Sequence, residues 1–106
     1  MSKNTFVASP LTALRLAEEQ ACAGYLVARK SMVRAAALVA SVSQLVRERP
    51  TRADYREVLG ELMGRHFDAE QRVRLAYERW QRAQRRADAF WVASNMSGAS
   101  VLGVAA

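Results

Sequence analysis

Two long stretches of the chain carry apolar residues at alternating steps of three and four, which is the spacing of one face of an α-helix. The stretch from Thr51 to Phe90 keeps this spacing without a slip through five heptads. A seven-residue repeat sustained over this length predicts a helix that packs along one seam against another helix. The stripe consists of Tyr55, Leu59, Leu62, His66, Ala69, Val73, Ala76, Trp80, Ala83, Ala87 and Phe90.

The partner helix is predicted immediately upstream, where only Glu18 breaks the same repeat. If the two helices run antiparallel, residues of the two stripes face each other when their numbers sum to 101. Ala21 then faces Trp80 and Tyr25 faces Ala76, so bulky residues meet small ones, as close packing requires. The sequence therefore predicts an all-α fold, an antiparallel two-helix coiled-coil hairpin. The upstream stripe consists of Leu11, Leu14, Glu18, Ala21, Tyr25, Ala28, Met32, Ala35, Val39, Val42 and Val46.

Local signals set the boundaries of the two helices. Ser9 and Pro10 form a start signal, because serine caps the free amides of the first turn and proline is accepted at the first helical position. Pro50 ends the first helix, since the residue before proline avoids helical geometry. Thr51 and Asp54 resemble a capping box that opens the second helix.

These signals divide the chain into three parts. We expect a loose segment over residues 1–9, a hairpin over 10–94 with helices at about 10–49 and 52–94, and a flexible small-residue tail over 95–106. A shorter three-helix domain is the alternative, although no stop signal interrupts either stripe.

The length of 106 residues allows one domain, and a lone hairpin of this size buries only one seam. We therefore expect the hairpin to assemble into a helical bundle, as an oligomer or with a partner. Sixteen Lys and Arg against ten Asp and Glu give a formal charge of +6, which favours acidic partners.

The half of the first helix from Met32 to Val46 is apolar on more than its seam, and Arg34 is its only charged residue. One partner helix cannot cover that much apolar surface, so this half is predicted to pack against a second copy or another protein. Solvated helix-favouring alanine is the other interpretation. The predicted partner-binding residues are Val33, Ala37, Leu38 and Leu45.

A row of arginines, spaced seven apart, lies next to the seam of the second helix. The facing flank of the first helix offers no carboxylate, although Asp68 and Glu78 lie close enough for partial pairing. The row predicts a site for an acidic partner or nucleic acid, or else a solvated flank whose arginine stems cover the seam. The row is Arg65, Arg72, Arg79 and Arg86, and Arg82 and Arg85 add charge near one end.

The sequence contains no arrangement typical of a catalytic centre, so we expect no enzymatic activity, no cofactor and no small-molecule substrate. His66 is interpreted as a seam residue, because a single histidine cannot complete a zinc site. The single Cys22, the lack of a signal peptide and the lack of 18 uncharged apolar residues in a row favour a cytoplasmic protein without a membrane span. Attachment to an acidic membrane surface is a third interpretation.

Helical hairpins of this length resemble two groups of bacterial secretion proteins. The secreted hairpins of the WXG family carry Trp-x-Gly at the bend, whereas this bend reads Arg49-Pro50-Thr51. The Arg- and Ala-rich run over residues 79–87 looks like the coiled-coil stalk and escort proteins of flagellar and type III secretion systems. This resemblance implies a non-enzymatic adaptor, chaperone-like protein or structural component of a bacterial assembly. The alternative function is nucleic-acid binding through the arginine row.

Overall fold

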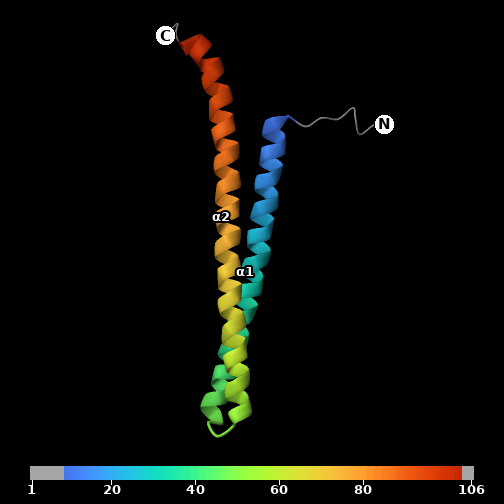
Figure 1. Cartoon of the computed structure of the whole chain (residues 1–106), viewed down its shortest axis with the longest axis vertical. Coiled ribbons are helices and arrows are strands. Elements are labelled where there is room, and N and C mark those ends of the chain that lie inside the picture. The colour runs from blue at the N-terminus through green and yellow to red at the C-terminus, as the bar shows by residue number, and fades with distance from the viewer. Residues whose placement is uncertain (1–8, 104–106) are drawn as a thin grey trace, which may run out of the picture.

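The computed structural model describes residues 9–103, with side chains up to Met96. Helix α1 (Pro10–Glu48) and helix α2 (Ala53–Gly103) lie side by side and antiparallel, joined by a tight bend (Figure 1). At 1.5 Å per residue, α1 alone is about 58 Å long. The prediction of an all-α two-helix hairpin is confirmed.

The start of α1 follows from the expected cap. The Ser9 hydroxyl accepts a hydrogen bond from the Thr12 amide at 3.1 Å, and Pro10 occupies the first helical position. At the other end, the Arg49 amide donates to the Leu45 carbonyl at 2.9 Å. Ser9 therefore satisfies one of the amides that the first turn leaves free.

The start of α2 differs from the expected capping box. The Asp54 carboxylate accepts two hydrogen bonds from the Arg52 guanidinium, at 2.9 and 2.7 Å. This bidentate pair lowers the pKa of Asp54, chiefly through the hydrogen bonds from Arg52. The Arg56 guanidinium also donates to the Pro50 carbonyl, so arginine side chains hold the bend.

Helix α2 continues past residue 94, where the sequence pattern predicts its end. It runs through Gly98 to Gly103, so residues 95–103 are helical rather than part of a loose tail. The physical reason is that alanine, methionine and serine tolerate a helix, and one glycine costs only about 1 kcal/mol relative to alanine. The end of α2 projects beyond the start of α1 (Figure 1).

The seam lies where the two stripes predict it. All eleven α1 positions of the stripe are half-buried, and the α2 positions are half-buried or buried from Tyr55 to Ala87, whereas Phe90 is exposed. Only two hydrophobic residues are fully enclosed among the described side chains, Ala69 at 4% and Ala87 at 0% exposure. The interior is therefore a single narrow line of contact.

Three aromatic residues mark the register of the seam. The Tyr25 and Trp80 rings stack with centroids 5.4 Å apart, and Tyr77 packs edge-on against both. The expected register sets Tyr25 opposite Ala76 and Trp80 opposite Ala21. Helical side chains lean toward their own N-terminus, so in an antiparallel pair these two rings lean toward each other and meet.

Candidate functional site

A groove runs between the two helices on the side of the hairpin that carries the arginine row. Gly24 and Ala28 of α1 lie across from Arg72 and Arg79 of α2, and the hollow has a volume of about 420 Å³. The structure thus brings these two arginines beside small residues of α1. Its complete lining is Gln20, Ala21, Gly24, Ala28, Arg72, Leu75, Ala76 and Arg79.

We call this whole side of the hairpin the groove flank. It contains one row on α1 and two rows on α2, each with a seven-residue interval, and a member of each row lines the groove. Residues seven apart return to nearly the same side of a helix, so the other members lie along the same flank. The α1 row is Ala17, Gly24, Ser31, Leu38 and Leu45. The first α2 row is Val58, Arg65, Arg72, Arg79 and Arg86. The second α2 row lies beside the first and is Asp54, Glu61, Asp68, Leu75 and Arg82.

The arginines of the groove flank have no close carboxylate within the hairpin. Among the side chains of residues 9–96, the ion pairs closer than 4 Å involve Arg15, Arg52 and His66 and none of the groove-flank arginines. Asp68 and Glu78, with which partial pairing is expected, are not within 4 Å of an arginine of this flank. All five are exposed. They therefore form an uncompensated positive strip: Arg65, Arg72, Arg79, Arg82 and Arg86.

Two acidic residues near the open end, Glu18 and Asp88, are engaged elsewhere. Arg15 donates hydrogen bonds to Glu18 and to Asp88 across the helices, both at 2.9 Å. These bonds raise the pKa of Arg15, the bond to Glu18 contributing most. Glu18 lies two positions before the groove residue Gln20, and Asp88 follows the buried seam residue Ala87. Neither Glu18 nor Asp88 lines the groove.

The bend end of the groove flank has the opposite character. Leu38 is 52% exposed and Leu45 is 39% exposed, so α2 leaves both leucines accessible. Val58 lies in the corresponding row of α2 and is also exposed. Asp54, Glu61 and Asp68 accompany them at the same seven-residue interval as the arginines.

The sequence interpretation missed this acidic row. The signal was present, because Asp54, Glu61 and Asp68 repeat every seven residues and lie three or four positions from the arginine row. With the acidic row included, one side of α2 is acidic near the bend and basic toward the open end.

The four predicted partner-binding residues do not share one surface. Val33 lines an open hollow of about 540 Å³ on the outer side of α1, and Ala37 lies seven positions after Lys30 of the same hollow. Leu38 and Leu45 belong to the groove flank instead. The apolar half of α1 therefore offers two separate surfaces, one facing outward and one beside α2.

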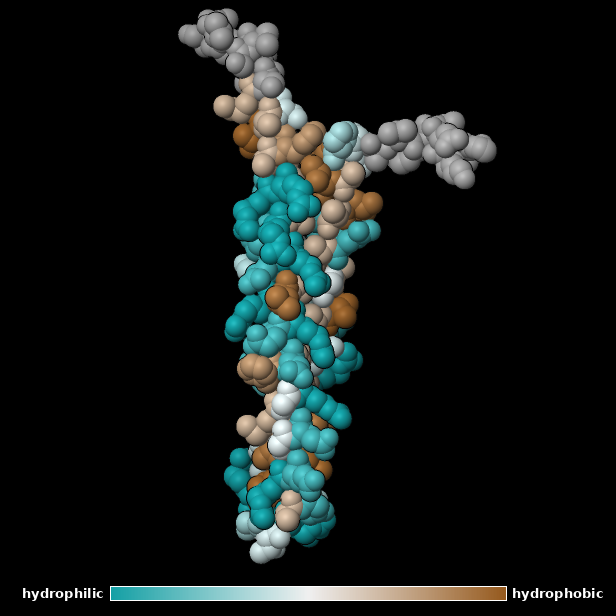
Figure 2. Space-filling view, in the orientation of Figure 1, coloured by the Kyte–Doolittle hydropathy of each residue, from teal (hydrophilic) through white to brown (hydrophobic). Residues whose placement is uncertain are grey.

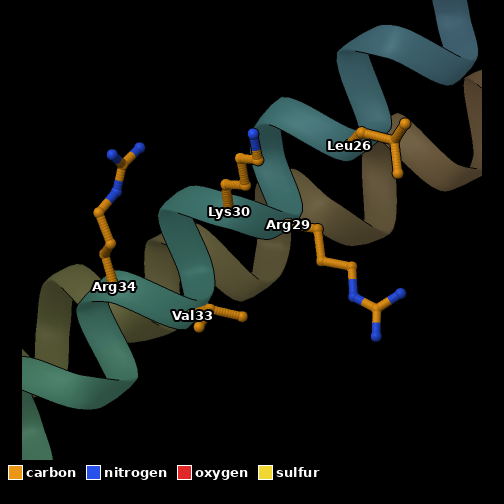
Figure 3. Close-up of a pocket in the computed structure, with 5 residues that line it drawn as sticks. All are labelled: Leu26, Arg29, Lys30, Val33 and Arg34. Carbon is orange, nitrogen blue, oxygen red and sulfur yellow. The ribbon is translucent and has the colours of Figure 1, made fainter.

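The outer hollow is made by α1 alone. Figure 3 shows α1 in front of α2, with Lys30 and Arg34 extending to one side of the helix and Arg29 to the other. Leu26 and Val33 are the apolar residues of this hollow. Since five residues of one helix make up the lining, the hollow is a furrow between side chains and not a cleft between elements.

Apolar residues are widely exposed over the hairpin. Among the side chains of residues 9–96, fifteen large hydrophobic ones are between 37% and 65% exposed. On the face in Figure 2, hydrophobic residues appear as separate brown spots along the rod and gather near its open end. Three of those near the end of α2 are Trp91, Val92 and Met96. The hairpin thus leaves more large apolar side chains outside the seam than it encloses.

The remaining chemically distinctive residues stand apart from one another. His66 is half-buried in the seam, with Nδ1 at 3.8 Å from a Glu70 oxygen, and Cys22 is a half-buried free thiol. Over the described residues, no group of three or more potential metal ligands comes together. None of the helices in that part of the chain is both long enough and apolar enough to cross a bilayer.

Comparison of the chain with protein-family models, with curated proteins and with solved structures finds no match.

Proposed function

We propose that this hairpin is a non-enzymatic interaction protein, an adaptor, chaperone-like or structural component that completes its packing by binding further helices along its flanks. The observation that carries the proposal is the exposure of Leu38 and Leu45 on the groove flank. Two leucines one heptad apart form the start of a second packing seam, parallel to the one the hairpin already uses.

The narrow interior supports the same proposal. With two enclosed alanines and a single seam, the hairpin buries little apolar area for its length. A further helix on the groove flank would remove Leu38, Leu45, Val58 and Leu75 from water at about 25 cal/mol per Å². The free energy of assembly would therefore add to the stability of a chain with a small core of its own.

Nucleic-acid binding is the second candidate, favoured by the uncompensated arginines of the groove flank. Two features weigh against it. The groove lining has no aromatic side chain on which bases could stack, and the strip continues into the exposed leucines at the bend. Helix packing uses both the leucines and the arginines of this flank, whereas phosphate binding uses the arginines alone.

A site-specific photo-cross-linker tests the proposal. With the cross-linking amino acid in place of Leu38, we expect covalent capture of another helical chain, or of a second copy, in the native cell. The same group in place of Glu57 of α2, an exposed residue outside the groove flank, serves as the control. Equal capture at the two positions, or no capture at Leu38, would remove the support for a binding flank.

The double substitution Leu38→Glu and Leu45→Glu provides an independent reading. Both side chains are accessible in the hairpin, so the variant should keep its helical circular dichroism while losing the captured chain. A variant that keeps its partner with both leucines charged would move the binding surface to another side of the hairpin.

A further inference from the structure

We infer that the helix bound by the groove flank belongs to a second copy of this chain, and that the two hairpins pack antiparallel about a twofold axis at the level of Ser31 and Glu70. This inference rests on the proposed function and names its partner. Under such an axis α1 faces α1 and α2 faces α2, because a C2 interface uses the same surface on both copies.

When the second copy is reversed about Ser31, its α1 row is complementary in residue size to the α1 row of the first copy. Leu38 then lies opposite Gly24 of the other copy, and Leu45 lies opposite Ala17. The bulky residues of the bend end meet the small residues of the open end, which is the alternation that facing layers need.

The groove at Gly24 has room for such a leucine. A Cβ atom built on Gly24 would meet nothing within 4 Å, so the hairpin itself gives no reason for a close approach at this glycine. The hollow of about 420 Å³ beside it is larger than a leucine side chain and is lined partly by Ala21, Ala28 and Ala76. Leu38 of a second copy fits this seat in size and in chemistry.

The α2 rows are complementary in charge when turned about Glu70. Every acidic member at the bend end then lies opposite an arginine of the open end, and the symmetry repeats each pair. Asp54 already binds Arg52 in its own chain, and its side chain remains 60% exposed, so it can accept a further donor. The pairs are Asp54 with Arg86, Glu61 with Arg79, and Asp68 with Arg72.

The two rows are compatible with one common axis. Residue size is satisfied by an axis at Ser31 in α1, and charge is satisfied by an axis at Glu70 in α2. These two positions lie at the same level of the hairpin, because 31 and 70 sum to 101, the register of the seam. The heptad repeat leaves both rows complementary in the neighbouring register as well, so the overlap of the rods decides between the two.

The overlap of the two rods favours this register over its neighbour. The level of Ser31 is close to the middle of α1 (Pro10–Glu48), so the α1 helices of the two copies overlap along almost their whole length. Sliding one copy by a heptad toward the bend would set Leu38 opposite Ser31 and leave Arg86 beyond the start of α2.

Charge reversal in two complementary variants tests the inference on the full chain. Arg72→Glu with Arg79→Glu leaves two acidic residues facing each other in the pairs 61/79 and 68/72, and Glu61→Arg with Asp68→Arg leaves two arginines facing each other in the same pairs. Each variant alone should dissociate. Sedimentation equilibrium should give its dimer a dissociation constant roughly 100-fold higher than that of the wild type. Mixed in equal amounts they should form a heterodimer, because every acidic position of one copy again faces an arginine of the other.

A matched control has the same change in charge outside the groove flank. Arg74→Glu with Arg85→Glu alters two exposed arginines of α2 that do not line the groove, and this variant should dimerise as the wild type does. Circular dichroism of each variant checks that the helices are intact. Recovery in the mixture further shows that neither charge-reversed chain is misfolded.

Three results would overturn the inference. They are a monomeric wild type at high concentration, charge-reversed variants that dimerise alone, and a mixture that stays monomeric. Binding of random duplex DNA by a monomer through Arg72 and Arg79 would replace it with the nucleic-acid function. If the wild type is monomeric but Leu38 still captures a different helical chain in the native cell, this inference fails and the proposed function stands.

Discussion

The two ends of the hairpin differ in the residues that fill the seam and in the residues that line the groove flank. At the open end, the seam is filled by the rings of Tyr25, Tyr77 and Trp80, and the groove flank carries small residues and arginines. At the bend end, the seam is mostly aliphatic, with Tyr55 and His66 among its members, and the flank carries leucines and carboxylates. The open end therefore has room for bulky side chains and attracts negative charge. The bend end carries bulky leucines and negatively charged carboxylates. A rod with such ends is complementary to itself when reversed.

The largest effect is expected from the aromatic cluster of the open end. Trp80→Ala should lower the free energy of unfolding by about 2–3 kcal/mol, at the low end for a tryptophan because the ring is only half-buried. Phe67→Ala is the control, since Phe67 is 59% exposed outside the seam and should change stability by less than about 0.5 kcal/mol. Urea unfolding followed by circular dichroism measures both. Similar losses for the two variants would mean that the rings of the open end do not stabilise the seam.

A smaller loss is expected where the seam is tightest. Ala87 has no exposed surface, so Ala87→Leu should cost about 1–3 kcal/mol by forcing the helices apart. Ala89→Leu inserts the same group two residues later at an exposed position and should be close to neutral. If Ala87→Leu unfolds at the same urea concentration as the wild type, the helices do not approach as closely at the open end as the structure places them.

Glycine substitutions should act in the opposite direction. A Cβ on Gly64 would meet nothing within 4 Å, so Gly64→Ala in α2 should stabilise the chain by about 1 kcal/mol through helix propensity alone. Gly24→Ala should give the same gain in dilute solution, where the hairpin is alone. At high protein concentration its gain should shrink, because the added methyl group occupies part of the seat for Leu38. Identical gains at all concentrations would contradict a role for Gly24 in assembly.

The smallest effect concerns the bend. The hydrogen bonds from Arg52 lower the pKa of Asp54 below its ordinary value of 3.8. This pair therefore contributes stability that is complete above the unfolded pKa and is lost as the pH falls through the lower folded value. Asp54→Asn should remove that part of the acid dependence, measured as thermal unfolding between neutral and strongly acidic pH. An unchanged acid profile would show that the pair has no stabilising role.

Much of the fold follows directly from the sequence. The three-four stripe gives the seam, because helix periodicity decides which residues can face a partner. The same periodicity could have separated Val33 and Ala37 from Leu38 and Leu45, since their places in the heptad differ. Composition alone groups these four residues, because it carries no information about direction around a helix.

Other features depend on competition between local interactions that a single sequence does not resolve. Thr51 and Asp54 have the spacing of a cap, yet the nearby Arg52 guanidinium binds the carboxylate in two places. The end of α2 lacks a strong stop signal, and small residues continue the helix beyond its partner. Open space beside Gly24 is a property of two packed helices and is visible only once both are placed.

A single cysteine at the proposed axis tests the reversed pairing of the two ends most directly. In a chain with Cys22→Ser, Ser31→Cys would place two thiols opposite each other across the interface, within the reach of a disulfide or a short bismaleimide. We expect rapid formation of a covalent dimer, and much slower formation for Ala37→Cys on the outer side of α1. A Ser31→Cys chain that stays monomeric under mild oxidation and cross-linking, or that links no faster than the Ala37→Cys chain, would contradict the reversed pairing.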